Sequence, residues 1–355
     1  MDFRENYRGL FSRNFYNFVG IRFDTFYIPF VGQRDFHELL KDVEVSRLNA
    51  FAKGSYSNLR TQIRCYFAYC VYFGRRPLPA HSKTIYGFVQ FLSRSMVPST
   101  VRNYLSGVRV LHIFHGLPFP HSEDFLLKLE LRGLARLNPH VPVRATPVTP
   151  SILRVFHQHM DGELSLHRCV WACSLFLFFT MARLGSILPK ARTTPLTTIL
   201  TNDRVNFSRE GLVITLLHTK TIQFGKRRLH IPLVRTTSFL CPVQAYEMAL
   251  LDRHGGGTGP AFIFEEENKH KALTTTSFIH TFRKVLASGG IKNASDFTGH
   301  SFRRGGATWA FQVGIPGELI QICGDWISDA YKQYLEFSMD DKLNLAAHLV
   351  RHLPS

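Results

Sequence analysis

Residues 300–308 read HSFRRGGAT, a run in which one histidine and two arginines lie close together. In a helix, His300 and Arg303 are three residues apart and face the same way, with about 5–6 Å between their Cβ atoms. An imidazole and a guanidinium placed like this can both reach one phosphate group. The run therefore predicts a helix that presents a phosphate-binding pair.

A second informative segment, GDWISDAYKQY at residues 324–334, lies nearer the carboxyl end. Ser328 or Asp329 can cap a helix there. That helix would display Tyr331 and Tyr334, which are one turn apart and lie roughly on the same side.

Two cations lie upstream of these segments. Arg183 follows the strongly apolar run 169–182, which is too short for the roughly 20 residues of a membrane span and predicts a buried helix closed by this arginine. Lys220 lies in the predicted bend between two strands. The predicted strands are residues 204–207, 212–217 and 228–233.

The composition points to a polyanionic partner. The 355 residues include 43 Lys or Arg and 26 Asp or Glu, which gives a formal net charge of +17, and 45% of the residues are hydrophobic. Such a chain can bury a sizeable core, and its length suggests two domains. Nucleic acid is the first candidate partner for this charge, and a merely soluble basic protein is the alternative.

The positive charge is concentrated between Val45 and Ser122, where ten Lys or Arg occur without any Asp or Glu. One helix is predicted to start near Ser55, with Arg60 and Arg64 on its flank. Its apolar stripe is predicted to be Leu59, Ile63, Phe67 and Cys70.

A second basic helix is predicted after Pro98, with Ser99 as its N-cap. Arg102, Ser106 and Arg109 share one face of this helix. The opposite, core face is predicted to be Val101, Leu105, Val108 and Leu111. A helix that is apolar behind and basic in front suits a DNA backbone or groove, and a solvated basic face is the alternative.

Four prolines at positions 139, 142, 147 and 150 predict an extended linker. The expected organisation is an aromatic-rich arm (1–45), a helical, basic domain suited to DNA binding (46–138), the linker (139–150) and a second domain with a C-terminal helix (151–355). The fold class expected is mainly α with a small antiparallel sheet (α+β).

Several chemistries have little support in the sequence. His157 and His159 point to different faces of a helix, the acidic run at 265–267 reads as a solvated loop, and no P-loop or dinucleotide fingerprint occurs. We expect no metal and no cofactor. The cysteines lack a zinc-site spacing and predict reduced, buried thiols in an intracellular setting, and no secretory signal or membrane span is predicted.

The polar segments, in this order, resemble the tyrosine recombinase (phage integrase-like) family, most closely the recombinases of DIRS-type and related eukaryotic retrotransposons. The resemblance covers roughly residues 50 to 340. The family's pattern is an arginine, a hairpin lysine, His-x-x-Arg, a histidine or tryptophan, and a tyrosine. The matching residues are Arg183, Lys220, His300, Arg303, Trp326 and Tyr334.

The chain departs from the family's common pattern at two positions. Trp326 stands where most bacterial members have histidine, and Ser186 stands where a glutamate is common after the first arginine. Neither departure removes a cation that a phosphate needs. Spacing from Trp326 favours Tyr334 over Tyr331 as the nucleophile.

The resemblance implies a two-domain clamp that cleaves and rejoins double-stranded DNA through a 3′-phosphotyrosyl bond, for integration of a mobile element in the nucleus. It implies a dimer on each site and a tetramer in synapsis. Arg144, Lys226 and Arg304 are further candidates for DNA contact. A C-terminal stripe of Leu345, Leu349 and Leu353 is expected to dock on a neighbouring protomer or on its own domain.

Two alternatives remain open from the sequence. A type IB topoisomerase-like enzyme shares the chemistry without needing specific sites or synapsis. A transposon-derived DNA-binding protein without recombination activity would keep the charge and lose the chemistry.

Overall fold

The computed structural model describes residues 36–119, 125–140, 144–222, 227–251, 253 and 257–335, with positions 339, 343 and 347 beyond them. The chain divides into two compact units, Met1–Pro142 and Val143–Ser355. The predictions for Lys226 and for the stripe of Leu345, Leu349 and Leu353 therefore concern residues outside the described ranges. No helix in the described ranges combines the length and apolar character needed to cross a membrane.

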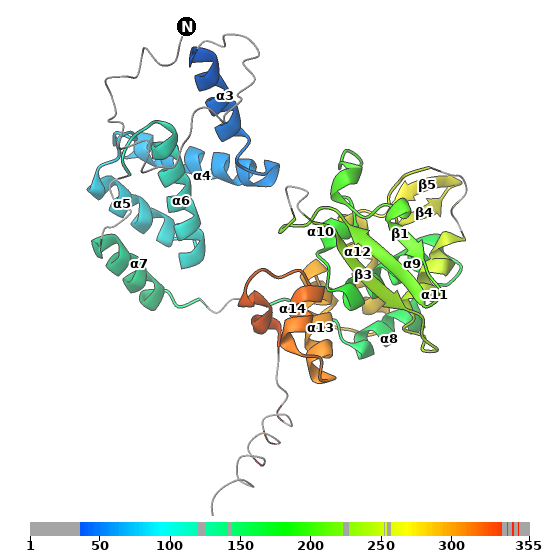
Figure 1. The fold of residues 1–355 in the computed structure, drawn as a ribbon. Coiled ribbons are helices and arrows are strands. Elements are labelled where there is room, and N and C mark those ends of the chain that lie inside the picture. Colours follow the sequence, from blue (N-terminus) through cyan, green and yellow to red (C-terminus); the bar gives the residue numbers. More distant parts are fainter. Residues whose placement is uncertain are drawn as a thin grey trace, which may run out of the picture. The chain divides into compact units, whose positions relative to one another are not determined.

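In its described part, the first unit consists of helices and the segments that connect them, without strands (Figure 1). Its helices are α3 (Phe36–Leu48), α4 (Lys53–Tyr72), α5 (Ser82–Ser93), α6 (Pro98–Phe114) and α7 (Phe125–Leu137). Helices α4, α5 and α6 enclose a small core that includes Tyr66, Phe88 and Val108, all fully buried. Helix α3 extends across residue 45, where the N-terminal arm was expected to end. The sequence predicted no helix there, because this segment is polar and only weakly periodic.

Two local predictions in this unit are corrected by the structure. Helix α6 begins two residues earlier than expected: Pro98 occupies its first turn and Val97, not Ser99, is the N-cap. In α4, Phe67 is 37% exposed and Tyr66 takes its place in the core. Because positions 66 and 67 differ by about 100° around a helix, a one-residue error moves the predicted stripe to its edge.

The second unit combines helices with small antiparallel sheets. Its α-helices are α8 (Pro150–His159), α9 (Ser165–Thr180), α10 (Leu184–Ile187), α11 (Pro242–Leu250), α12 (Thr275–Ser288), α13 (Gly299–Gln312) and α14 (Gly317–Cys323). Its 3₁₀ helices are η2 (Leu196–Thr198), η3 (Asn202–Arg204), η4 (Ala294–Asp296) and η5 (Asp329–Tyr334). Helix α9 is the core element, since nearly all of its residues from Cys169 onward are buried and α11, α12 and α13 pack against it.

The main sheet has the antiparallel order β1 (Val205–Phe207), β2 (Gly211–Leu216) and β3 (Leu229–Val234). A second hairpin pairs β4 (Ile263–Glu266) with β5 (Lys269–Ala272). The acidic run at 265–267 is therefore not a loop: it ends β4, and Glu267 and Asn268 form the turn with positive φ angles of 53° and 58°. The mainly α fold with small antiparallel sheets matches the expectation.

Helix α9 ends at Thr180, two residues before the predicted end. Met181 adopts a left-handed conformation with φ 52°, which turns the chain away from the helix axis. Oγ1 of Thr180 accepts a hydrogen bond from the backbone N–H of Ala182 at 3.2 Å. Arg183 therefore does not close α9: it is the N-cap residue of the short helix α10.

The end of the predicted linker, residues 144–149, belongs to the second unit and packs on α13. The backbone N–H of Val148 donates to the carbonyl of Ser301 at 3.0 Å, which joins the extended segment 144–149 to α13. Gly305 makes this approach close, since a Cβ on it would lie 1.8 Å from the Val148 carbonyl oxygen. The segment is thereby part of the frame that holds the candidate site.

Candidate active site

Helix α13 carries the predicted phosphate-binding pair. A capping box begins the helix: the Thr298 hydroxyl accepts a hydrogen bond from the backbone N–H of His300 at 3.2 Å, and the Ser301 hydroxyl accepts one from the backbone N–H of Thr298 at 2.8 Å. His300 lies in the first turn and keeps access to solvent. Arg303, one turn later, is only 2% exposed.

The Arg303 guanidinium is fixed on two sides. Its Nη1 donates to the carbonyl oxygen of Met181 at 2.5 Å, and its Cζ lies 3.6 Å from the ring centroid of Trp326. A guanidinium over an indole face is a favourable cation–π arrangement. Among the described residues, its buried Nη2 has no hydrogen-bond partner, so this nitrogen is a donor that an anion can satisfy.

Lys220 lies in a tight turn directly after β2. The backbone N–H groups of Thr219 and Ile222 donate to each other's carbonyls at 3.1 and 3.3 Å, which closes the turn around Lys220 and Thr221. Thr219 and Ile222 are buried, whereas Lys220 is exposed. The turn thus anchors the backbone of the lysine and leaves its long side chain at the surface.

His300 and the three cations of the predicted site lie close enough to influence one another. Partial burial, followed by the charges of Arg303, Arg183 and Lys220, lowers the pKa of His300. Burial and then the charge of Arg183 lower the pKa of Arg303 to about 9. A crowded cationic cluster of this kind favours the binding of an anion, because an anion relieves the mutual repulsion.

The two tyrosines of η5 differ in their surroundings. Tyr331 is 5% exposed, and its phenol oxygen would lie 3.0 Å from a Cβ added to Gly317. Tyr334 is half-buried and lines an open cavity of about 650 Å³ together with His300. Its ring centroid is 5.7 Å from that of Trp326. The arrangement leaves Tyr334, rather than Tyr331, facing the cavity that a substrate can enter.

Contacts from two other segments fix the backbone of η5. The Thr308 hydroxyl of α13 donates to the carbonyl oxygen of Tyr334 at 2.5 Å. Nη1 of Arg144 donates to the carbonyl oxygen of Gln333 at 3.4 Å. Ser328 caps η5 by accepting from the N–H of Ala330, as one of the two predicted caps. The position of Tyr334 is therefore set by α13 and by the segment 144–149.

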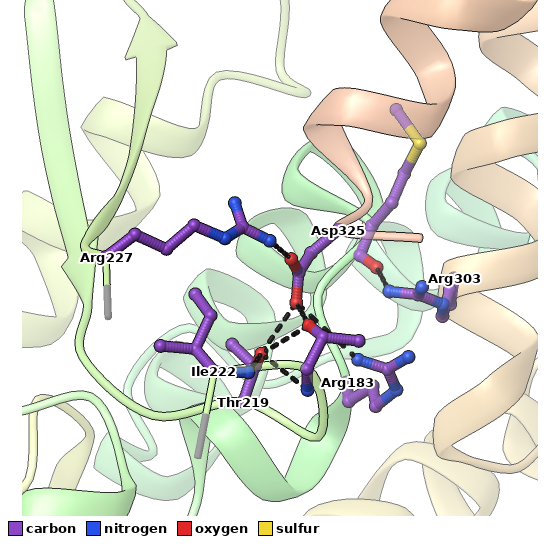
Figure 2. Close-up of polar contacts among 8 residues, drawn as sticks. Arg183, Thr219, Ile222, Arg227, Arg303 and Asp325 are labelled. Carbon is purple, nitrogen blue, oxygen red and sulfur yellow. Dashed lines mark hydrogen bonds and ion pairs between the residues drawn. The ribbon is translucent and has the colours of Figure 1, made fainter. Parts of the chain in front are cut away.

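Asp325 is a buried acid in this cationic site, and the sequence reasoning did not single it out. Its Oδ2 accepts a hydrogen bond from the Thr219 hydroxyl at 2.6 Å and forms an ion pair with Nη1 of Arg183 at 3.9 Å. Its Oδ1 accepts a hydrogen bond from Arg227. Figure 2 shows the carboxylate between Arg227 on one side and Thr219 and Arg183 on the other. Its place directly before Trp326, in a site made otherwise of cations, was the available signal.

The predicted DNA-contact residues of the first unit are at its surface. Arg60 and Arg64 of α4 are exposed, as are Arg102, Ser106 and Arg109 of α6. The core face predicted for α6 is buried as expected, so the three α6 residues form one accessible polar face.

The two described DNA-contact candidates of the second unit, Arg144 and Arg304, differ in their exposure to solvent. Arg144 is exposed and lines the cavity beside Tyr334. Arg304 is 7% exposed, and its Nη1 donates to the carbonyl oxygen of Ala145 at 2.8 Å. This contact gives Arg304 a structural task, which is to tie the segment 144–149 to α13.

The described residues show no cluster suited to a metal ion. No group of three or more His, Cys, Asp or Glu side chains among them could hold one. All six cysteines are free thiols, of which Cys70, Cys169, Cys173 and Cys241 are buried. Cys65 is partly buried and Cys323 is exposed, which differs from the expectation of buried thiols throughout.

Comparisons with known proteins bear on this fold and site. The chain matches no protein-family model. An integrase/recombinase xerD homolog from Selenomonas ruminantium is 24% identical over 253 residues, which is 70% of each chain.

Solved structures give the stronger likeness. The Tn1549 transposon integrase, in complex with transposon right end DNA, aligns with a TM-score of 0.60 at 11% identity, over 87% of this chain and 98% of that chain. A lambda integrase dimer bound to a COC′ core site aligns with a TM-score of 0.53 at 14% identity, over 84% and 95% of the two chains.

The fold is that of the tyrosine recombinases and integrases. The chain is thus similar in sequence to an integrase/recombinase and similar in fold to two integrases.

Proposed function

We propose that this protein is a site-specific DNA recombinase that cleaves and rejoins DNA through a 3′-phosphotyrosyl bond to Tyr334. One observation carries the proposal: residues from five separate segments converge on one cationic site beside the cavity that Tyr334 lines. The converging residues are Arg183, Lys220, His300, Arg303, Trp326 and Tyr334.

The arginines would neutralise the phosphate during attack. A phosphodiester is anionic and resists an anionic phenolate, so its pentavalent transition state needs fixed positive charge. Planar guanidinium groups provide forked donors for phosphate oxygens. Arg303 is held by Met181 and Trp326 and keeps one buried donor unused in the described part of the chain, which suits this task.

The remaining groups would move protons. The Tyr334 oxygen attacks phosphorus while its proton passes toward His300, and the bond from phosphorus to the 5′ oxygen breaks. Lys220 gives a proton to the departing 5′ oxygen. The phosphotyrosyl bond stores the energy of the broken linkage, so attack by another 5′-hydroxyl reverses the step without a cofactor.

Double-stranded DNA is the proposed partner of both units. The structures that share the fold are complexes with transposon-end or core-site DNA. In this chain, the accessible face of α6 with Arg102, Ser106 and Arg109 offers phosphate contacts in a segment without acidic residues. The sequence resemblance leads us to propose that the DNA belongs to a mobile element of the DIRS-type retrotransposon class, acted on in the nucleus.

Assembly of several protomers on DNA is a further part of the proposal. Helices α13 and α14 and the residues after them expose a group of large apolar side chains. This group consists of Trp309, Val313, Ile315, Leu319, Ile322 and Ile327. We propose that the apolar C-terminal segment of a second copy covers it when dimers form on each site and tetramers form in synapsis.

A trapping experiment tests the proposed chemistry. A nicked suicide substrate that carries the element's own termini should yield a covalent protein–DNA adduct on denaturing gels. Tyr334→Phe should abolish the adduct, because no nucleophile remains, whereas Tyr331→Phe should retain it. Both variants should still bind DNA, since neither changes charge. An adduct that persists in Tyr334→Phe contradicts the assignment.

The same experiment separates the alternatives. A DNA-binding protein without recombination activity gives no adduct in any variant. A topoisomerase-like enzyme gives the adduct and relaxes supercoiled DNA but forms no junctions between two substrates. Recombinant junctions that depend on the terminal sequence are the result expected here.

A further inference from the structure

The Asp325 carboxylate joins separate parts of the site. Its side chain is 4% exposed. Its Oδ2 accepts hydrogen bonds from the hydroxyls of Thr219 and Thr221, which are the residues on either side of Lys220. One carboxylate oxygen therefore fixes the lysine-bearing turn from both flanks.

The same carboxylate reaches two arginines. Its Oδ1 accepts a hydrogen bond from Arg227, which lies two residues before the start of β3. Its Oδ2 pairs with Nη1 of Arg183 at 3.9 Å. Asp325 thus ties both ends of the loop between β2 and β3 to the arginine at the start of α10 (Figure 2).

The backbone around Asp325 is shaped for this placement. Asp325 has a left-handed φ of 56°, which aspartate tolerates better than most residues. A Cβ on Gly324 would lie 1.6 Å from the Trp326 ring, so only glycine fits beside the indole. The segment Gly324-Asp325-Trp326 therefore delivers the acid to the Lys220 turn and the indole to Arg303 at the same time.

The position of Ser186 explains why an acid is needed here. Ser186 lines a small cavity of about 10 Å³ together with Arg183, Thr219 and Asp325. A serine at this place supplies no charge to Arg183. The negative charge comes instead from Asp325, which lines the same cavity.

We propose that Asp325 is a positioning residue that holds the Lys220 turn in the geometry that lets Lys220 protonate the leaving 5′ oxygen. The inference rests on the proposed recombinase function. It assigns Asp325 no contact with DNA and no proton transfer of its own: the carboxylate acts on Lys220 through Thr219 and Thr221.

The test compares two leaving groups. Asp325→Asn keeps the shape of the side chain and removes its charge, so the hydrogen bonds that hold the Lys220 turn weaken. On ordinary DNA, covalent cleavage should slow by about 10-fold or more, which is part of the roughly 10²–10⁴-fold that general acid catalysis supplies. On a 5′-bridging phosphorothiolate, whose sulfur leaves without a proton, most of the lost rate should return. Asp329→Asn, at an exposed acid of η5 paired only with Lys332 at 2.7 Å in the described structure, is the matched control and should cleave both substrates like the wild type.

A second variant isolates the link to the turn and guards against misfolding. Thr221→Val removes one hydroxyl from Asp325 and leaves the pair between Asp325 and Arg183 in place. It should show the same slowing on ordinary DNA and full recovery on the phosphorothiolate. Unchanged melting temperatures of both variants would show that the folded state is intact.

The outcomes separate this inference from the function on which it rests. An equal loss on both substrates, or no loss on either, in Thr221→Val and in folded Asp325→Asn overturns the positioning role. If the wild type forms no covalent adduct with either substrate, the recombinase function itself is wrong.

Discussion

At the scale of single residues, the site is a set of cations held together before any phosphate is present. Arg303 is buried against Trp326, and Arg183 lies close enough to depress its pKa. His300 shares this field, and its pKa lies below the ordinary value because of partial burial and three neighbouring charges. Such an arrangement is preorganised for an anion, because the arginine charges are in place before the phosphate binds.

The lowered pKa of His300 predicts proton uptake on DNA binding. In the free protein the imidazole is neutral at pH 7, because its pKa is held below the ordinary value of about 6.5. A bound phosphate offsets the neighbouring cations and raises that pKa, so the complex holds more protons than the free protein. Affinity for DNA should therefore rise as the pH falls from about 8 to about 6.

Anisotropy titrations at several pH values measure this coupling. His300→Gln should lose part of the pH dependence, because glutamine binds no proton in this range. His280→Gln, at a histidine of α12 outside the site, is the control and should keep the dependence of the wild type. Identical pH slopes for His300→Gln and the wild type would contradict the coupling.

Lys220 and Arg303 should differ in their response to the leaving group. Lys220→Ala should cleave ordinary DNA at least about 10²-fold more slowly, the lower end of general-acid catalysis, and recover most of its rate on a 5′-bridging phosphorothiolate. Arg303→Ala should not recover, because it neutralises phosphate charge whichever atom leaves. Single-turnover cleavage rates decide the matter: equal rescue of both variants, or of neither, refutes this division of roles.

At the scale of elements, α13 is the frame of the site. It carries His300 and Arg303, holds Tyr334 through Thr308, and packs closely on α9. The close packing depends on Gly306, where a Cβ would lie 2.1 Å from the Phe178 carbonyl oxygen of α9. The two glycines after the arginines are thus required by close backbone contacts, of Gly305 with Val148 and of Gly306 with α9, rather than by a turn.

Gly306→Ala should destabilise the second unit. The added methyl group meets backbone and cannot be accommodated by a rotamer change, so α13 must shift away from α9. We expect a loss of about 1–3 kcal/mol in the free energy of unfolding, the usual cost of overpacking. Denaturant unfolding followed by circular dichroism measures it.

Gly133→Ala is the matched control for this substitution. Gly133 lies in α7 with no atom within 4 Å of an added Cβ. Alanine there should raise stability by about 0.4–1 kcal/mol, because it reduces the freedom of the unfolded chain. A Gly306→Ala protein as stable as the wild type would show that α13 can move without cost.

At the scale of the whole molecule, two compact units share one excess of positive charge. The second unit holds the candidate chemistry. The first has a separate core and an exposed basic face on α6. Charge on this scale sets affinity and its salt dependence, whereas chemistry depends on the few residues around Tyr334.

Replacing Arg102 and Arg109 together with alanine should weaken DNA binding in a salt-dependent way. Each lost phosphate contact should reduce the slope of log K against log[salt] by roughly 0.9. Binding isotherms at several salt concentrations measure the slope. Arg136→Ala, at an exposed arginine of α7, is the comparison within the same unit. An unchanged slope in the double variant would leave α6 as a solvated basic face.

The sequence by itself determined the features that depend on local spacing. The buried face of α6 follows from its apolar period, and the helix bearing His300 and Arg303 follows from its cap and spacing. The buried helix α9 follows from its continuous apolar run. These features need only neighbours within a few turns, so a linear pattern contains them.

Tertiary structure alone decided which of these faces meet. The left-handed Met181 moves Arg183 from the end of α9 to the start of α10, and packing against Gly317 buries Tyr331 while Tyr334 faces the cavity. Asp325 gains its role from threonines more than 100 residues away in the sequence. Such partners are brought together by the core and not by spacing along the chain, so no period or motif in the sequence encodes them.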